Sequence, residues 1–358
     1  MKTIVSIISA QPTPNYLLIR ELFEPGDELL FITSTKMQKN IKPIVDTLSW
    51  DNVVINEVIL ADGEEERWSI MCSHIEKAIS KNKQYAVNLT GGTKYMALAV
   101  QSVFEKYDTL FYYVPFPKNV ILTKDSEQPI TTRLTVAEYM QLHGHKIKAS
   151  NTIRTFVDAK QMLVYFTQRF RENEFGIIDK LREYRNSDTQ ISWVETKENE
   201  PRKPNISGLQ DFLNRIGFVS KEADMLTKYE TQYLTGGWFE EYVYYLMQNE
   251  VGVTDIRFGV KLNETNNDLD VVFTKDNRLF VVECKTGIEK GSMLNQIAYK
   301  SAALNDFLKG LSSKSYILAL ASDNPNWSKI PRSMNIAYFG REFFLKESKT
   351  RELLDSLK

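Results

Sequence analysis

The residues best placed to do chemistry are Asp270, Glu283 and Lys285, which interrupt two runs of apolar, largely β-branched residues. The two runs flank a short polar segment that contains an Asp-Asn pair, a pattern typical of a β-hairpin. Side chains alternate across a strand, so Glu283 and Lys285 share one face while Cys284 points to the other. We therefore expect Asp270, Glu283 and Lys285 to converge on one face of a small sheet.

Two carboxylates and an ammonium group in one place suit phosphodiester hydrolysis. Asp270 and Glu283 offer the hard oxygen ligands that Mg²⁺ or Mn²⁺ prefers, and such a metal polarises a phosphate and activates water. Lys285 could orient that water or neutralise developing charge, and only the backbone carbonyl of Cys284 could reach the metal. The alternative is a plain salt bridge at a strand edge. The apolar surroundings favour the first reading, because buried charges are costly unless they are paired or bound to metal.

Length and composition limit the class of protein. The chain has 358 residues, 42% of them hydrophobic, which is enough for two or three domains with sizeable cores. A formal net charge of −1 means that any nucleic-acid groove must be a local basic patch. The two cysteines lie far apart, no Cys/His spacing suits zinc, and nothing in the sequence resembles a signal peptide or a membrane-spanning segment. We expect a cytoplasmic protein with no disulfide bonds and no membrane association.

The first 145 residues alternate between strand and helix patterns. Short connections between them imply a parallel sheet covered on both faces, a doubly wound Rossmann-like α/β fold. The expected strands are 3–8, 28–32, 53–60, 85–89 and 110–114, and the expected helices are 15–23, 37–48, 64–80 and 94–106.

Three of these strands end in polar loops, at 9–15, 33–36 and 88–94. Doubly wound sheets bind ligands beyond the carboxyl ends of their strands. Glycines let backbone N–H groups approach an anion, and Thr and Lys add direct phosphate contacts. The loops match neither a Walker A motif nor Gly-x-Gly-x-x-Gly. The alternative is that Gly91-Gly92 only makes a turn and Thr93 caps a helix, but three converging loops favour a phosphate-binding surface.

The acidic stretch resembles the PD-(D/E)xK nuclease signature, with Asp270, twelve intervening residues and then Glu283-Cys284-Lys285. The resemblance implies a restriction-endonuclease-like α/β/α domain. Upstream, the segment 235–243 is similar to the Gly-x-Phe-Glu opening of the family's first core helix, whose acid, here Glu240, joins the metal site. Downstream, Gln296 corresponds to the family's Gln-bearing helix. The resemblance thus implies catalytic roles for Asp270, Glu283, Lys285, Glu240 and Gln296, and a metal held by Glu240, Asp270, Glu283 and the Cys284 carbonyl. Where the signature has Pro-Asp, this chain has Asp268-Leu269-Asp270.

The segment 88–96, together with the loop at 9–15, resembles the CARF domain, the sensor of cyclic oligoadenylates in type III CRISPR defence. The residues that match the motif are Thr90, Gly91, Gly92, Thr93, Lys94 and Met96, with Asn88 at the strand end. The residues expected to bind the ligand are Ser9, Gln11, Thr13, Asn15, Thr33, Ser34, Lys36, Asn88, Thr90, Gly91, Gly92, Thr93, Lys94 and Met96.

The two resemblances together predict the layout of the ancillary nucleases of type III CRISPR systems. We expect a CARF domain at 1–145, a largely helical connector at 146–224 and a nuclease domain at 225–358. The expected protein is a homodimer that binds cyclic tetra-adenylate across its two-fold axis and then cuts nucleic acid with Mn²⁺ or Mg²⁺. The substrate is DNA, with RNA and the strandedness left open. Two alternatives stay open: a sensor with an inactive nuclease fold, and a ring nuclease that degrades its own ligand.

Overall fold

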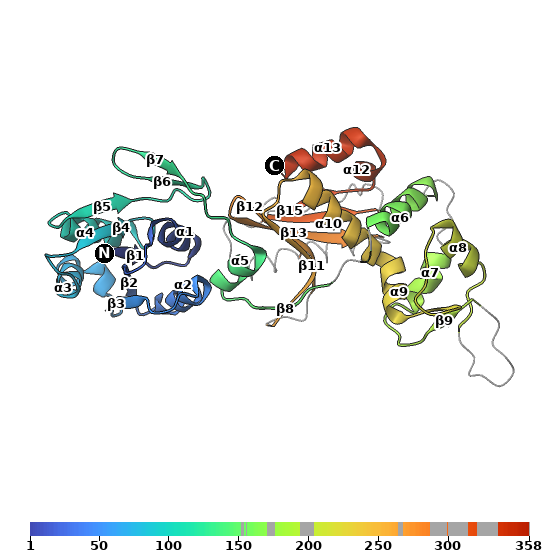
Figure 1. The fold of residues 1–358 in the computed structure, drawn as a ribbon, viewed down its shortest axis with the longest axis horizontal. Helices are drawn as coiled ribbons and strands as arrows, with labels where there is room; N and C mark the ends of the chain where they lie inside the picture. The colour runs from blue at the N-terminus through green and yellow to red at the C-terminus, as the bar shows by residue number, and fades with distance from the viewer. Residues whose placement is uncertain are drawn as a thin grey trace. The chain divides into compact units, whose positions relative to one another are not determined.

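The computed structural model describes residues 1–151, 154, 156–169, 176–193, 204–263, 268–286, 299, 314–320 and 336–357. These residues form two compact units (Figure 1). The N-terminal unit contains Met1–Ile147 and a short outlying segment, Thr274–Leu279; the C-terminal unit contains the described parts of 148–273, 280–305 and 314–358. Residues of the expected connector thus group with the C-terminal unit, while the division into three domains remains a prediction. None of the helices described here has the length and apolar character needed to cross a bilayer.

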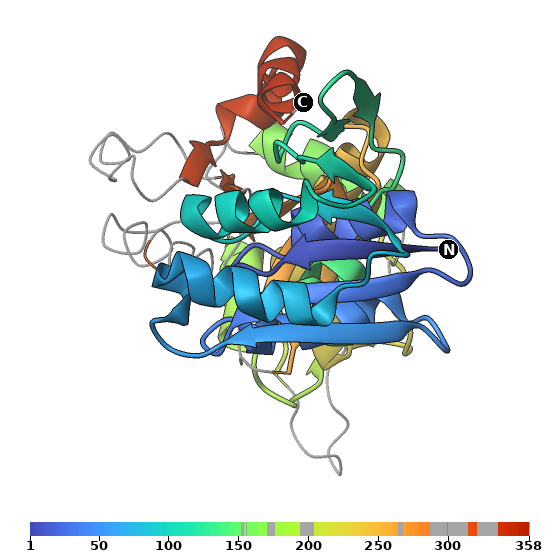
Figure 2. The same ribbon diagram turned by 90° about the vertical axis from the view of Figure 1, so that its left-hand side faces the viewer.

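The N-terminal unit is built on a parallel sheet of five strands in the order β3-β2-β1-β4-β5. Helices α1 and α2 follow the first two strands and pack against each other, and Figure 2 shows α3 and α4 side by side over the sheet. The bounds are β1 Lys2–Ile7, α1 Thr13–Leu22, β2 Glu28–Ser34, α2 Ile41–Leu48, β3 Val54–Leu60, α3 Trp68–Ala78, β4 Gln84–Asn88, α4 Lys94–Phe104 and β5 Thr109–Tyr112. This confirms the predicted doubly wound sheet, with each element within a few residues of its expected place.

One surface of the sheet packs into a core of aliphatic side chains, and Ile4, Leu29 and Phe31, which face the other surface, are fully buried as well. Val5 and Ile7 of β1 pack with Leu30 and Ile32 of β2 and with Val100 of α4. Their burial explains the unbroken apolar runs in the sequence, because a parallel strand covered on both faces has no solvent side. The strand order reverses on the two sides of β1, so the carboxyl ends of β1 and β4 meet at the switch point where such folds bind ligands.

After β5 the chain forms a small hairpin and one more helix. These are β6 Val120–Leu122, β7 Glu127–Pro129 and α5 Val136–Leu142. Helix α5 begins with a capping box, in which Thr135 and Glu138 satisfy each other's backbone N–H groups. The sequence pattern predicts a helix over 135–143 that ends at His143-Gly144-His145, and Gly144 takes the positive φ of 83° that ends many helices.

The outlying segment of the N-terminal unit is the tip of a hairpin. Its two-residue turn, Asp276-Asn277, has φ values of 49° and 59°, the left-handed conformation that Asp and Asn tolerate in tight hairpin turns. Asn277 is fully buried; its amide donates to Thr132 O and Asn119 Oδ1, and its Oδ1 accepts from Leu134 N. The Thr274 hydroxyl donates to Leu134 O at 2.6 Å. The tip is therefore fixed by buried hydrogen bonds within the N-terminal unit.

The C-terminal unit contains a sheet in the order β15-β14-β13-β12-β11-β8. The central pair, β12 Asp268–Lys275 and β13 Arg278–Lys285, forms the predicted hairpin. Toward the turn, β12 runs two residues and β13 one residue beyond the apolar runs 268–273 and 279–285. The other bounds are β8 Ile147–Ala149, β11 Asp255–Leu262, β14 Lys314–Ala319 and β15 Ile336–Phe339. Strands β14 and β15 run parallel to β13. The apolar runs at 314–321 and 335–339 predict both strands, whereas the sequence pattern did not predict β11.

Helices cover this sheet and extend beyond it. Helix α10, Trp238–Glu250, begins where the sequence placed the first core helix, and its Trp238 and Phe239 are fully buried. The sequence pattern predicts one terminal helix over 342–357; in the structure it is divided at Lys346 into α12 Glu342–Leu345 and α13 Glu347–Ser356. The remaining elements are α6 Phe156–Arg169, α7 Gly176–Glu183, β9 Ile191–Ser192, α8 Leu209–Arg215, β10 Met225–Leu226, α9 Lys228–Gln232 and a π-turn, Tyr233–Gly237.

Candidate active site

Asp270, Glu283 and Lys285 converge, as their alternation along the two strands predicted. The Lys285 ammonium lies 2.6 Å from Glu283 Oε1 and 3.3 Å from Asp270 Oδ2. The backbone N–H of Cys284 donates to the same Asp270 oxygen at 2.7 Å, which fixes the carboxylate against the neighbouring strand. The convergence confirms the hairpin register on which the prediction rested.

The Lys285 ammonium contacts three oxygen atoms: Asp270 Oδ2, Glu283 Oε1 and the Cys284 carbonyl, the last at 3.2 Å. Two carboxylates and one carbonyl are hard ligands of the kind that Mg²⁺ and Mn²⁺ take. A cationic group therefore already occupies the point toward which these oxygens are directed. In the part of the chain that the structure describes, no group of three His, Cys, Asp or Glu side chains is arranged to hold a metal. A metal here would use the carbonyl as its third protein ligand and would displace the ammonium.

Burial and mutual repulsion govern the protonation of this site. Burial, and then the charge of Glu283, raise the pKa of Asp270 to about 6. Burial also opposes the charge on Lys285, but the two neighbouring carboxylates outweigh it and raise the pKa of the ammonium. Lys285 therefore stays protonated at neutral pH and can act as a donor or a positive charge, not as a base.

Glu240 joins the site from the first helical turn of α10. Burial, followed by the charge of Asp270, raises the pKa of Glu240 to about 8, and Lys285 and Arg185 act in the opposite direction. A cavity of about 950 Å³ is lined by Glu240 together with the three residues from the hairpin. The expectation that Glu240 approaches the strand residues is thus supported by the structure, while its role in binding metal remains a prediction. Gln296 lies outside the described residues.

Cys284 points away from the cavity, as predicted. Its side chain is 7% exposed and packs in the hydrophobic core of the C-terminal unit. Burial, and then the negative charge of Asp270, raise the pKa of its thiol. A buried, protonated thiol is a poor nucleophile, so the side chain contributes packing and only the backbone carbonyl faces the site.

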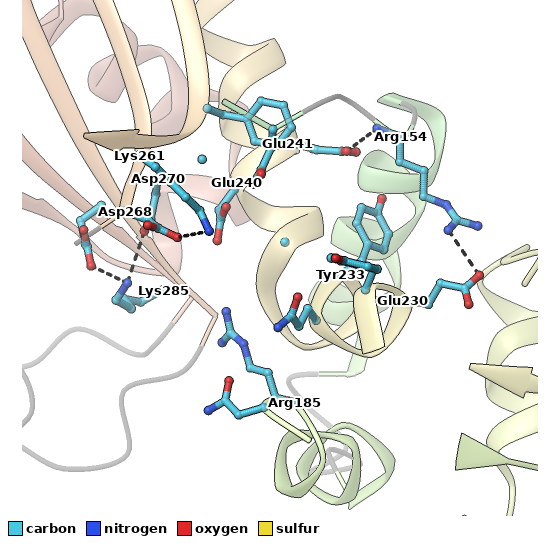
Figure 3. A pocket seen from close by; sticks show the side chains of 18 of the residues that line it. Arg154, Arg185, Glu230, Tyr233, Glu240, Glu241, Lys261, Asp268, Asp270 and Lys285 are labelled. Atoms are coloured by element: carbon cyan, nitrogen blue, oxygen red, sulfur yellow. Dashed lines mark hydrogen bonds and ion pairs between the residues drawn. The ribbon is translucent and has the colours of Figure 1, made fainter. Parts of the chain in front are cut away.

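Basic and aromatic residues that sequence reasoning did not single out line the same cavity (Figure 3). They are Arg154, Arg185, Lys221, Tyr229, Tyr233 and Lys261. Arg154 is paired with Glu230 and Asp158, and Lys261 with Asp268. The only sequence signal for Arg185 was the mixture of basic and apolar residues at helical spacing in 156–185, which does not reveal which residues face a cavity.

The second candidate site lies at the carboxyl ends of β1 and β4 in the N-terminal unit. Asn88 Nδ2 donates to Asn15 Oδ1 at 2.7 Å, and Asn15 Nδ2 donates to the Ile7 carbonyl. The Thr90 backbone N–H and hydroxyl both donate to Asn88 Oδ1. These side chains join the loops after the two strands into one rigid structure.

Gly91 and Gly92 are required by space and by backbone conformation. A Cβ on Gly91 would lie 1.9 Å from the Ile7 carbonyl oxygen, so only glycine lets the two loops come this close. Gly92 has a φ of +71°, which also favours glycine. Thr93 caps α4 by accepting from Met96 N. The turn-and-cap interpretation is therefore correct for these residues, and it does not conflict with an anion site at the same helix start.

The predicted ligand residues differ in their access to solvent. Gly92, Thr93, Lys94 and Lys36 are exposed, and Ser9, Gln11 and Thr90 are partly exposed. The others are buried: Thr13, Asn15, Thr33, Ser34, Asn88, Gly91 and Met96. A ligand would reach the first group directly, whereas Met96 packs in the core. The fourteen assignments remain predictions.

Two separate parts of the chain match family models. Residues 3–139 match the family model of the Card1 CARF domain, and residues 227–341 match that of the Card1-like endonuclease domain. No curated protein matches the sequence closely enough to add a relative.

Solved structures share the fold over the whole chain. Protein VC1899 from Vibrio cholerae has a TM-score of 0.78 at 18% identity, covering 99% of this chain and 98% of that one. Can2 from Sulfobacillus thermosulfidooxidans, solved in complex with cyclic tetra-adenylate, has a TM-score of 0.76 at 20% identity over 100% of both chains. A type III CRISPR defence DNA nuclease activated by cyclic oligoadenylate has a TM-score of 0.60 at 17% identity, covering 94% of this chain and 48% of that one.

Proposed function

Because the chain belongs with the Card1-type proteins that join a CARF domain to an endonuclease domain, we propose that it is a metal-dependent endonuclease activated by cyclic tetra-adenylate in type III CRISPR defence. The observation that carries the nuclease assignment is the set of three oxygens around Lys285 Nζ, with Glu240 beside them. The choice of activator is supported by the likeness to Can2, which was solved with that ligand.

The proposed mechanism assigns each side chain a task that its chemistry allows. Asp270, Glu283 and the Cys284 carbonyl would hold Mn²⁺ or Mg²⁺, with Glu240 as a further carboxylate, and the metal would supply Lewis acidity toward the phosphate and an activated water. Lys285, once released from the carboxylates, donates to a non-bridging phosphate oxygen and stabilises the negative charge that develops there. The ammonium can do this at neutral pH because a lysine side chain keeps its proton there even without neighbouring carboxylates.

The route of activation is supported by the hairpin that carries the catalytic residues. Its tip groups with the N-terminal unit, while Asp270 and Glu283 lie further along the same strands in the C-terminal unit. Within the N-terminal unit, hydrogen bonds run from Tyr16 of α1 to Glu138, from Glu138 to Thr135 at the start of α5, and from Leu134 to the tip. A ligand that shifts α1 would thereby bias the position of the strands, provided that it binds one arrangement more tightly than the other.

We further propose that the working enzyme is a homodimer. A cyclic ligand with two-fold character matches an interface in which both subunits offer the same surface. The exposed residues Lys94, Thr93 and Lys36 would then contact the phosphates of the ring from both subunits.

The test is a cleavage panel with purified full-length protein and Mn²⁺. Labelled single-stranded DNA, duplex DNA and RNA are incubated with and without each cyclic oligoadenylate. We expect cleavage only with cyclic tetra-adenylate and Mn²⁺, and we expect Glu283→Ala to abolish it while ligand binding is unchanged, because the sensor is a separate folding unit.

The matched control is Glu347→Ala, which removes an exposed carboxylate on α13 and should cut as the native protein does. If Glu283→Ala protein still cuts, the metal site has been assigned wrongly. If native protein binds the ligand but cuts nothing, the sensor with an inactive nuclease fold is the better description. Conversion of labelled cyclic tetra-adenylate to a linear product would support the ring nuclease.

A further inference from the structure

Arg185 differs from most of the other cations in the active-site cavity in the partners of its charged group. Arg154 is paired with Glu230 and Asp158, Lys261 with Asp268, and Lys285 with the catalytic carboxylates. Across the described ranges, the Arg185 guanidinium makes no ion pair or side-chain hydrogen bond, and the same holds for the Lys221 ammonium. Of these two, Arg185 reaches Gly236, which lies two residues before the helix that carries Glu240. The Arg185 guanidinium therefore lies in the cavity of the catalytic acids without an ion-pair partner among the described residues.

The backbone that carries Arg185 is firmly held. The side chain follows α7 in a hydrogen-bonded turn, in which Tyr184 N donates to Leu181 O and Arg185 N donates to Arg182 O. Leu181 is fully buried, and Tyr184 packs against the same core. The turn therefore fixes the base of the side chain even though its end is exposed.

Two further contacts join this turn to the catalytic elements. The Arg182 guanidinium donates to the Thr286 hydroxyl, one residue after Lys285, and that hydroxyl donates to the Thr235 carbonyl. The Arg185 guanidinium lies along Gly236, where a Cβ would be 3.4 Å from its Nη1 atom. Figure 3 shows Arg185 extending into the cavity from below Glu240. The glycine leaves room for the guanidinium to lie against the backbone just before α10.

We propose that Arg185 binds a phosphate of the nucleic-acid substrate next to the phosphodiester that is cut. A planar guanidinium offers paired donors that match two phosphate oxygens, and it stays charged at any working pH. The carboxylates that would hold the metal line the same cavity. A nucleic-acid strand with one phosphate at these carboxylates would therefore bring a neighbouring phosphate to Arg185. Residues of the predicted connector would thus complete the nuclease site. This inference rests on the proposed function.

The first test is binding at several salt concentrations. A labelled oligonucleotide is titrated with full-length Glu283→Gln protein, which should not cut, and with the same protein carrying Arg185→Ala, Arg185→Lys or Arg215→Ala. Arg215 is an exposed arginine at the end of α8 that does not line the cavity, so it is the matched control. We expect Arg185→Ala to weaken binding about 10- to 100-fold and Arg185→Lys to lie between. Loss of one phosphate contact should also reduce the slope of log K against log salt concentration by about 0.7 to 0.9.

The second test is cleavage in an otherwise native chain. Arg185→Ala should lower kcat/KM with an unchanged thermal midpoint, whereas a merely structural role would shift the midpoint and leave the salt slope as it was. If Arg185→Ala and Arg215→Ala behave alike in binding and cleavage, the inference is wrong while the nuclease assignment stands. If native protein cuts no substrate, the proposed function fails, and the salt slope still decides whether Arg185 binds phosphate.

Discussion

Replacing Lys285 by methionine tests whether its ammonium stands where a metal would bind. Methionine keeps much of the length of the side chain and removes the charge. The variant would leave Asp270 and Glu283, whose side chains are 14% and 8% exposed, without their cation. Breaking a buried pair by removing one partner costs about 3 to 5 kcal/mol. Because Lys285 itself is 30% exposed, we expect a loss near the lower limit, about 3 kcal/mol, in metal-free protein at pH 8.

The size of this loss should depend on pH. The ammonium holds the pKa of Asp270 down against burial and against Glu283, so its removal raises that pKa further above about 6. An acid whose folded pKa is raised stabilises the protein below its unfolded pKa, and that stability is lost as pH rises through the folded pKa. Lys285→Met protein should therefore be close to the native protein in stability at pH 5 and fall behind it between pH 6 and 8.

The same variant should respond more strongly to Mn²⁺, because no ammonium has to be displaced. A ligand at one hundred times its Kd stabilises the folded state by about 2.7 kcal/mol, enough to restore most of the loss. Cleavage should still be absent, since the phosphate loses its donor. The assays are chemical unfolding at pH 5 to 8 with and without Mn²⁺, and calorimetric metal titration.

The control is Lys261→Met in the same cavity. Lys261 pairs with Asp268 at 3.5 Å, and both side chains are 51% exposed, so its loss should cost less than about 1 kcal/mol. The reasoning is refuted if Lys285→Met is as stable as Lys261→Met at pH 8 and binds Mn²⁺ no better than native protein.

Three further substitutions test other parts of the interpretation. Lys94→Ala should raise the activating concentration of cyclic tetra-adenylate about 10- to 100-fold, because a charged contact to phosphate is lost. The control is Lys77→Ala, on the exposed surface of α3. An unchanged activation midpoint in Lys94→Ala protein would argue against a ligand site at the carboxyl ends of β1 and β4. Cys284→Val should keep most activity, and thiol-alkylating reagents should act slowly on native protein, since the thiol is buried in the core. A folded Cys284→Val protein that binds metal but does not cut would contradict a purely structural role for the thiol. Asn277→Gly keeps the left-handed turn but removes the three hydrogen bonds of a buried side chain, so it should cost about 2 to 4 kcal/mol and expose the Leu134 amide to hydrogen exchange. Equal protection of that amide in both proteins would exclude the proposed role of the tip.

Much of the fold was predictable because local pattern encodes it. Continuous apolar runs separated by helical periodicity specified the five parallel strands of the N-terminal unit. Alternation along β12 and β13 placed Asp270, Glu283 and Lys285 on one face and Cys284 on the other. The rule that parallel strands present their carboxyl ends at one edge brought the loops of β1 and β4 together. In each case the spacing of residues within a short segment determines which face or which end of a strand they occupy.

Tertiary packing decided which residues from distant parts of the sequence contact one another. Arg185 comes 98 residues before Glu283, and it reaches the cavity because α7 packs against the segment 233–237, so that the guanidinium lies along Gly236. Asn277 looked like an ordinary turn residue, yet its amide is buried among backbone groups that precede it by more than a hundred residues. The sequence likewise did not determine which residues of the polar loops stay exposed. Asn15 and Asn88, for example, are buried and hydrogen-bonded to each other. Periodicity cannot predict such pairings, because the partners of a charged or polar side chain depend on how whole helices and strands pack. The sequence around that side chain does not encode which distant residues these partners are.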